Sequence, residues 1–279
     1  MDSFMAFFSD LSPLYKFAWI MAWLSAGLLI EFARPLFRDP KLKRGWPHFR
    51  TNLALMASTM AINTAVGVLT VGVFEWVETA EIGLLPNVAW NAWLELGIAF
   101  LALDLIGQYT VHYVLHKQPL LWRLHMVHHS DTHVDATTGL RHHPLDFLLR
   151  ETFALVAVIV VGAPLAFYAA YRIATVFFTY FSHANFRLPD AVDRALSWVI
   201  ISPNMHKFHH HDRVVWTDSN YGNILSIWDR IFGTLVYDDP SKVTYGLDTT
   251  DPERADDLGY QLSLPWRKTE VQEPPVVLQ

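Results

Sequence analysis

The chain has 279 residues, of which 52% are hydrophobic and 17% charged, and its formal net charge is −6 at pH 7. Soluble domains usually carry about a quarter charged residues, so this composition, with 11 Trp and 18 Phe, favours a protein that faces lipid. The absence of cysteine excludes disulfides, cysteine-based zinc sites, iron–sulfur clusters and thiol catalysis, and the charge pattern lacks the basic concentration that nucleic acid requires.

Four apolar stretches are long enough to cross a bilayer, which takes about 20 residues in a helix. The first is Leu14 to Leu36, and the second, Thr51 to Phe74, has no charged residue. The third runs from Val88 to about Leu115. The fourth, Thr152 to Phe181, contains a Gly-Ala-Pro sequence at 162–164 that should break a helix, so we interpret it as a hairpin of two helices. The first twelve residues lack the basic start of a cleavable signal peptide, and we expect none.

The charges of the connecting segments orient these stretches. Around the loop between the first two lie six Lys or Arg residues and one acid, whereas the loop between the second and third has three Glu and no base. The positive-inside rule places the basic loop in the cytoplasm. The third stretch then runs inward and the hairpin returns to the same side, so the segments that follow both should meet at the cytoplasmic face.

We therefore predict an all-α, multi-pass membrane protein: a polytopic helical bundle of about four to five spanning or hairpin helices with a cytoplasmic, histidine-rich helical cap. Residues 1–103 would form the N-terminal transmembrane helices, and 104–236 a domain that contains the histidine motifs and the membrane hairpin. Residues 237–279 would form a C-terminal cytoplasmic cap, with a loose tail from about Lys268.

Thirteen of the fourteen histidines lie between residues 112 and 211. His112 and His116 are four residues apart, and two further motifs place three histidines at i, i+3 and i+4, so each set shares one face of a helix. The first triplet is His125, His128 and His129, and the second is His206, His209 and His210. Further candidates are His183 and the adjacent pair His142 and His143.

These histidines predict a centre that holds two metal ions. Burying so many imidazoles without partners would cost several kcal/mol. One ion takes about four to six ligands. The candidates are more than that: His112 and His116, the two triplets, His183 and either His142 or His143. They are too many for one ion and fit two. Imidazole suits Fe, Zn, Cu or Ni, so ligand type leaves the metal open.

Other histidines are weaker candidates for ligands. We expect His48 to be an ordinary surface residue and His133 to lie at the surface or next to the ligands. His211 should point to another face of its helix. Spacing alone does not choose between His142 and His143.

The motifs resemble those of the fatty acid hydroxylase/sterol desaturase superfamily of integral-membrane di-iron enzymes. The match runs in order from about Asp104 to Thr234, about half of the chain. It includes Leu121 to Ser130, Leu140 to Leu145, Pro203 to His210 and Leu225 to Thr234. The domain 104–236 is thus similar to the catalytic domain of that family.

The resemblance favours His143, the histidine directly before the proline, over His142, and it supports leaving His211 out. Two positions depart from the family pattern. Tyr113 stands where the family commonly has Arg, and Asp104 lies one residue further from the first histidine than the usual aspartate. Neither departure removes a ligand.

The implied site contains ten metal ligands and several residues that orient them or shape a pocket. The expected ligands are His112, His116, His125, His128, His129, His143, His183, His206, His209 and His210. The candidate supporting residues are Trp122, Asn185, Asn220, Tyr221, Trp228 and Asp229.

The resemblance implies an enzyme that uses O2 and two Fe ions to hydroxylate or desaturate an unactivated C–H of a sterol-like, fatty acyl or other lipid. Electrons should come from a ferredoxin, a cytochrome b5-like protein or a flavin reductase, because the chain has no haem-attachment motif, dinucleotide fingerprint or Cys cluster. The alternative is a metal-binding or metal-transport protein without redox chemistry, whose ligands should lie near the bilayer midplane. Bis-His haem binding would need single histidines facing each other across helices.

Overall fold

The computed structural model describes residues 1–37 and 45–267, and within these ranges the regular elements are all helices. The expected tail from Lys268 and most of the basic loop lie outside the described residues. The α-helices are α1 (Asp2–Ser9), α2 (Pro13–Ala33), α3 (Gly45–Thr79), α4 (Ala92–Asp104), α5 (Val111–Lys117), α6 (Pro119–His129), α7 (Pro144–Val161), α8 (Leu165–His183), α9 (Asp190–Leu196), α10 (Pro203–His209), α11 (Val214–Thr217), α12 (Ile227–Ile231) and α13 (Leu258–Ser263). The predicted all-α fold is confirmed.

Within the described ranges, three helices are long and apolar enough to cross a membrane: α2, α3 and the continuous run Ala92–Lys117, which joins α4 to α5. The predicted fourth stretch is a hairpin of the shorter helices α7 and α8. Its break lies at the expected place, because Gly162 ends α7 in the left-handed region with φ +70°. A Cβ at Gly162 would clash with the carbonyl oxygen of Ile82, so glycine also allows two loops to pack closely there.

A π-helical turn, Leu105–Thr110, joins α4 to α5. A π turn holds one residue more than an α turn over the same stretch, and such turns often lie at functional sites. The turn lies between Asp104 and His112. It therefore accommodates the extra residue that separates these two positions in the sequence.

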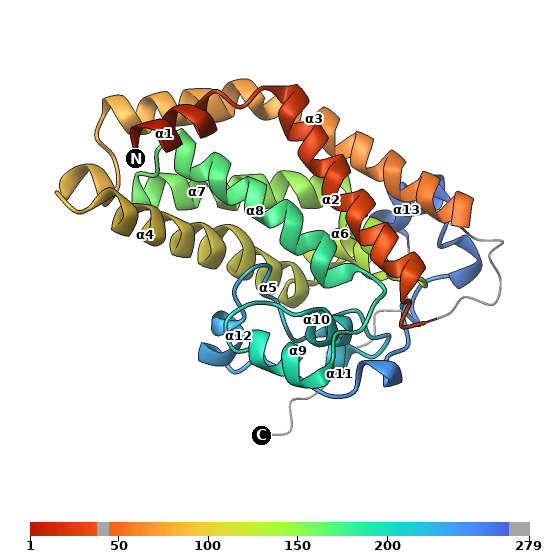
Figure 1. Cartoon of the computed structure of the whole chain (residues 1–279). Coiled ribbons are helices and arrows are strands. Elements are labelled where there is room, and N and C mark those ends of the chain that lie inside the picture. Colours follow the sequence, from red (N-terminus) through yellow and green to blue (C-terminus); the bar gives the residue numbers. More distant parts are fainter. Residues whose placement is uncertain (38–44, 268–279) are drawn as a thin grey trace.

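The short helices α9 to α12 gather beneath the long ones, at the end where α5 and α8 finish (Figure 1). The chain after α12 then passes to α13, which packs against α3. Residues 264–266, directly after α13, pack against α6. Helix α5 packs directly on α6, and α10 packs on α8, so the helices that carry most of the histidines are in contact in pairs.

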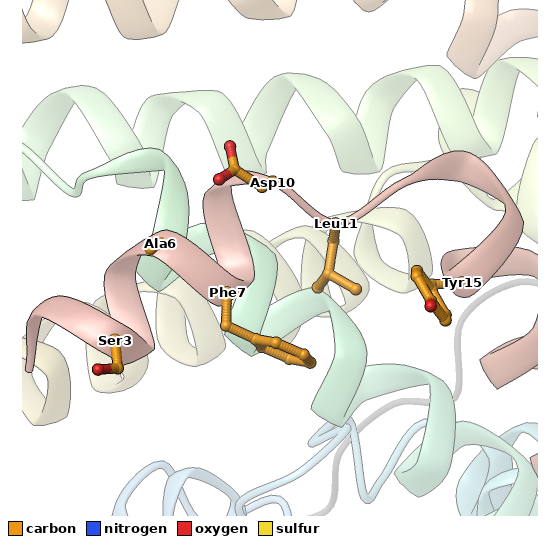
Figure 2. Close-up of a pocket in the computed structure, with 6 residues that line it drawn as sticks. All are labelled: Ser3, Ala6, Phe7, Asp10, Leu11 and Tyr15. Carbon is orange, nitrogen blue, oxygen red and sulfur yellow. The ribbon is translucent and has the colours of Figure 1, made fainter.

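The N-terminal helix α1 packs against α8, and Met1, Phe4 and Met5 join the apolar core that includes Phe74 and Val77. An open pocket lies between α1 and the start of α2, and Figure 2 shows the side chains of Phe7, Leu11 and Tyr15 along it. The residues that line this pocket are Ser3, Ala6, Phe7, Asp10, Leu11 and Tyr15. None of them is a histidine, so this pocket is separate from the histidine centre.

Candidate metal centre

Nine of the ten predicted histidines come together in two adjacent groups. Helices α5 and α6 carry two histidines each toward the first group, and α10 carries a fifth. The second group combines one histidine of α6, one at the end of α8, one within α10 and one directly after α10. The spacing in the sequence explains the local part of this arrangement, since i, i+3 and i+4 positions share a helix face.

The first group consists of His112, His116, His125, His129 and His209, which each offer one ring nitrogen within 4.8 Å of the others. The Nε2 atom of His125 lies 3.0 Å from that of His112 and 3.2 Å from that of His129. Two nitrogens that bind one ion at about 2.1 Å and at right angles are about 3 Å apart. The spacing therefore fits a shared ion.

The second group consists of His128, His183 and His210, with His206 beside them. The Nε2 atom of His183 lies 3.2 Å from that of His128 and 3.2 Å from that of His206. The two groups are neighbours, because the rings of His129 and His210 have centroids 4.7 Å apart. This arrangement supports two metal positions side by side.

Five of the nine rings are held by a hydrogen bond from Nδ1, which leaves Nε2 as the ligand atom. An oxygen that only accepts requires the ring nitrogen to donate, so these contacts fix the tautomer. The acceptors are the carbonyl of Tyr221 for His112 at 2.7 Å, Asp146 for His125 at 2.8 Å, the carbonyl of Arg141 for His128 at 3.3 Å, the carbonyl of Thr179 for His183 at 2.7 Å and the carbonyl of Ser219 for His209 at 2.6 Å.

Several ring nitrogens are buried without a hydrogen-bond partner among the described residues. They include Nε2 of His116 and His209 and both nitrogens of His210. Leaving a buried polar atom unpaired costs about 1–3 kcal/mol. A metal ion at each group would bind Nε2 of His116 and His209 and one ring nitrogen of His210, so the residues present fit two ions.

Burial also keeps the imidazoles neutral, as ligands must be. It lowers the pKa of His125 to about 4, because desolvation outweighs the opposing effect of Asp146. Desolvation, reinforced by the neighbouring imidazoles, holds the pKa of His128, His129 and His210 well below the usual 6.5. At pH 7 these rings therefore have free lone pairs for a metal.

His143 is the expected ligand that the structure does not bring to either group. Its Nδ1 accepts from the backbone N–H of Leu145, and its Nε2 lies 3.3 Å from the carbonyl oxygen of Leu262. His143 thus caps the start of α7. His142 lies at the centre instead: its ring stacks on that of His128 with centroids 4.6 Å apart.

Asp146 is a residue of the centre that the sequence reasoning missed. It is fully buried and binds His125, and Arg150 donates from Nε to its other oxygen at 2.9 Å. His142 Nδ1 lies 3.4 Å from it. A carboxylate one helical turn after a histidine is a signal that could have identified it.

Two predicted supporting residues, Trp122 and Tyr221, contact the ligands directly. The ring of Trp122 lies 4.8 Å from that of His116 and 5.3 Å from that of His129. Tyr221 packs its ring 5.1 Å from His116, and its carbonyl accepts from His112. Both therefore restrict how the rings can turn.

Asp229 and Asn220 act on the loop that contains Tyr221. Asp229 accepts from the backbone N–H groups of Tyr221 at 2.8 Å and Gly222 at 3.0 Å. Asn220 adopts a left-handed backbone with φ +52° and joins this loop to Val236 through two hydrogen bonds. These contacts set the position of the carbonyl that holds His112.

Asn185 and Trp228 bind elsewhere. The side-chain amide of Asn185 pairs with the backbone of Phe37, at 3.0 Å and 2.9 Å. The indole N–H of Trp228 donates to Asp104 at 2.9 Å, and Tyr171 donates to the same carboxylate at 2.7 Å. These contacts join segments of the chain to one another and involve no metal-ligand candidate.

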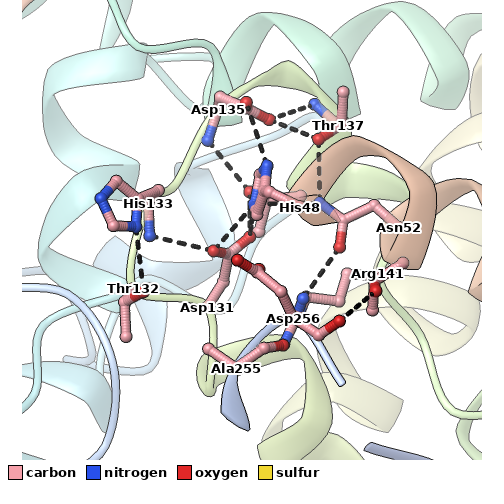
Figure 3. Close-up of polar contacts among 12 residues, drawn as sticks. His48, Asn52, Asp131, Thr132, His133, Asp135, Thr137, Arg141, Ala255 and Asp256 are labelled. Carbon is pink, nitrogen blue, oxygen red and sulfur yellow. Dashed lines mark hydrogen bonds and ion pairs between the residues drawn. The ribbon is translucent and has the colours of Figure 1, made fainter. Parts of the chain in front are cut away.

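His48 is not the surface residue that we expected. It is buried, and its Nε2 lies 2.9 Å from Asp131, next to the fully buried Arg141 (Figure 3). Arg141 donates to Asn52, Ser130 and the carbonyls of residues 127 and 255. Because its own carbonyl accepts from His128, this network fixes one acceptor of the second group.

The remaining two histidines lie outside both groups. His133 is half-buried beside His48, with ring centroids 6.4 Å apart. His211 pairs with Asp212 at 2.6 Å.

The family model described as fatty acid hydroxylase matches residues 96–234. The chain is 30% identical over 176 residues to an alkylglycerol monooxygenase of Xenopus tropicalis, covering 63% of this chain and 37% of that protein. It is 30% identical over 129 residues to the ornithine lipid hydroxylase OlsE of Rhizobium tropici, covering 46% and 38%. It is 26% identical over 213 residues to a cholesterol 25-hydroxylase-like protein of Danio rerio, covering 75% and 81%. The chain thus spans less than half of the first two relatives, and no solved structure matches it.

Proposed function

Because the chain belongs to the fatty acid hydroxylase/sterol desaturase superfamily, we propose that it is a membrane-embedded lipid hydroxylase that holds two iron ions at its histidine centre. The observation that carries this proposal is the pair of buried imidazole groups whose ring nitrogens converge, several of them without a hydrogen-bond partner among the described residues. The iron pair, when bound, supplies the activation of O2 for insertion of oxygen into a C–H bond.

The first ion would be held by the group that α5, α6 and α10 form, and the second by the group that includes the end of α8. The proposed ligands are His112, His116, His125, His129 and His209 for the first, and His128, His183, His206 and His210 for the second. Hydrogen bonds from Nδ1 orient five of these rings before the metal binds. The nine rings are almost completely buried, and the His116 side chain is only 2% exposed. This burial would keep bulk water away from the metals.

A lipid substrate fits both the composition of the chain and its relatives. Three helices are apolar enough to span a bilayer, so an apolar substrate can approach from the membrane without crossing water. The relatives' names specify an alkylglycerol, an ornithine lipid and cholesterol, and all three indicate addition of oxygen. We therefore favour hydroxylation over desaturation.

The electrons and the side of the membrane are further parts of the proposal. We propose that a ferredoxin, a cytochrome b5-like protein or a flavin reductase supplies the electrons, because the chain itself has no cysteine for an iron–sulfur cluster. The positive-inside rule supports a cytoplasmic histidine centre. Metal transport is less well supported, because the nine histidines gather at helix ends and not in the middle of the apolar spans.

Lipid analysis tests the proposed reaction. Cells that express the chain should contain a lipid heavier by one oxygen atom, about 16 mass units, that is missing from cells without it. The lipid extracts of both strains are compared by mass spectrometry, with a strain that expresses the His210→Ala variant as the control for an indirect effect of the protein. A loss of about 2 mass units would indicate desaturation instead, and identical lipids in all strains would contradict the proposal.

A further inference from the structure

An exposed apolar surface lies on the short helices beneath the long ones, next to α9 and α12 and away from the histidines. It consists of Trp198 and Val199, which follow α9, and Ile231 and Phe232 at the end of α12. Their exposed fractions are 64%, 57%, 66% and 56%. We call these four residues the cap surface. Large apolar side chains exposed together usually mark a contact with a protein or a membrane.

Hydrogen bonds join the two segments into one surface. The backbone N–H of Ser226 donates to the carbonyl of Val199 at 3.0 Å, and Arg230 donates to the carbonyl of Ser197 at 2.9 Å. The guanidinium of Arg230 also lies over the ring of Trp198, 4.0 Å from its centroid. The exposed side chains are therefore held next to each other.

The cap surface is continuous with a membrane-spanning helix. Phe232 stacks on Tyr109 of the π-helical turn with ring centroids 5.2 Å apart, and the Tyr109 hydroxyl pairs with Thr234 at 2.9 Å. Nearby, Trp228 donates to Asp104 at 2.9 Å. The segment around α12 is thus attached along the side of the Ala92–Lys117 run.

These attachment points lie within the apolar length of that run. At a rise of about 1.5 Å per residue, Asp104 is about 18 Å and Tyr109 about 25 Å from its start at Ala92. The hydrocarbon core of a bilayer is about 30 Å thick. A segment fixed at these two positions therefore lies at a depth where acyl chains surround the helix.

We propose that the cap surface is inserted into the same leaflet as the end of this helix and contacts lipid acyl chains. Trp198 suits such a place, since an indole lies favourably at the membrane interface. The inference rests on the proposed membrane location of the chain, but not on its catalytic chemistry.

The absence of cysteine allows a direct test with single-cysteine variants. Ile231→Cys is labelled with a bimane fluorophore in the full chain, reconstituted in phosphatidylcholine vesicles. The first control is Leu101→Cys, at an exposed position of α4, which reports the spanning helix. The second is Ser241→Cys, at an exposed position of the segment that follows α12. Each is quenched in turn by a nitroxide on a lipid acyl chain and by iodide in the buffer.

The expected result is that the label at position 231 behaves like that at 101: the lipid nitroxide quenches it several-fold more than iodide does, with the reverse order at 241. Equal behaviour at 231 and 241 would overturn the insertion of the cap surface while leaving the spanning helix intact. Protection of position 231 from both quenchers would overturn it too, because a protein and not lipid would then cover the surface. Iodide quenching at 101 would overturn the membrane location itself.

Discussion

Replacement of His210 with alanine is expected to remove the metal of the second group and to lower formation of the oxygenated lipid by more than about 100-fold. Both ring nitrogens of His210 are buried without a hydrogen-bond partner within residues 1–37 and 45–267. The substitution therefore removes no hydrogen bond of the folded chain, and its effect should fall on the metal. The measurement is metal per chain by mass spectrometry, together with the lipid product.

The matched control is His211→Ala. His211 is the next residue, carries the same side chain, and pairs with Asp212 outside both groups. This variant should keep both metals and the wild-type amount of product. Wild-type product from the His210 variant, or equal metal loss in both variants, would contradict the assignment of His210.

Replacement of Asp146 with asparagine should weaken metal binding at the first group by about 10- to 100-fold. The substitution keeps the size of the side chain but removes the charge that His125 and Arg150 contact at 2.8 Å and 2.9 Å. A neutral amide polarises the imidazole less and holds it less firmly. The dissociation constant is measured by competition with a chelator, for wild type and variant alike.

A second measurement separates this role from simple destabilisation. The melting temperature of the metal-free protein reports the stability of the fold alone. We expect this melting temperature to change little in the variant, while its dissociation constant for the metal rises. Asp238→Asn is the control. Asp238 is exposed, and its carboxylate forms an ion pair with Lys242, away from the histidine centre. An unchanged dissociation constant in the Asp146 variant would show that this carboxylate does not support the centre.

The sequence was informative wherever the arrangement is local. Histidines at i, i+3 and i+4 lie on one helix face whatever surrounds the helix, so both triplets could be recognised as units. The apolar lengths and the Gly-Ala-Pro break likewise predicted the three long apolar helices and the hairpin, which the helix bounds confirm. The extra residue between Asp104 and His112 was visible, but the π-helical turn that accommodates it was not.

Contacts between distant segments could not be derived in this way. His142 and His143 are adjacent, and the choice between them depends on which ring caps α7 and which stacks on His128. His48 is buried where α3 packs against the segment that contains Asp131, 83 residues further along the chain. Spacing within one helix predicts neither the choice between His142 and His143 nor the burial of His48.

The metal content of the purified wild-type protein tests the central claim most directly. After expression in iron-containing medium, the account predicts two non-haem irons per chain, determined by mass spectrometry and by an absorption spectrum without haem bands. Haem bands, or zinc as the only metal, would contradict an iron centre held by the two histidine groups.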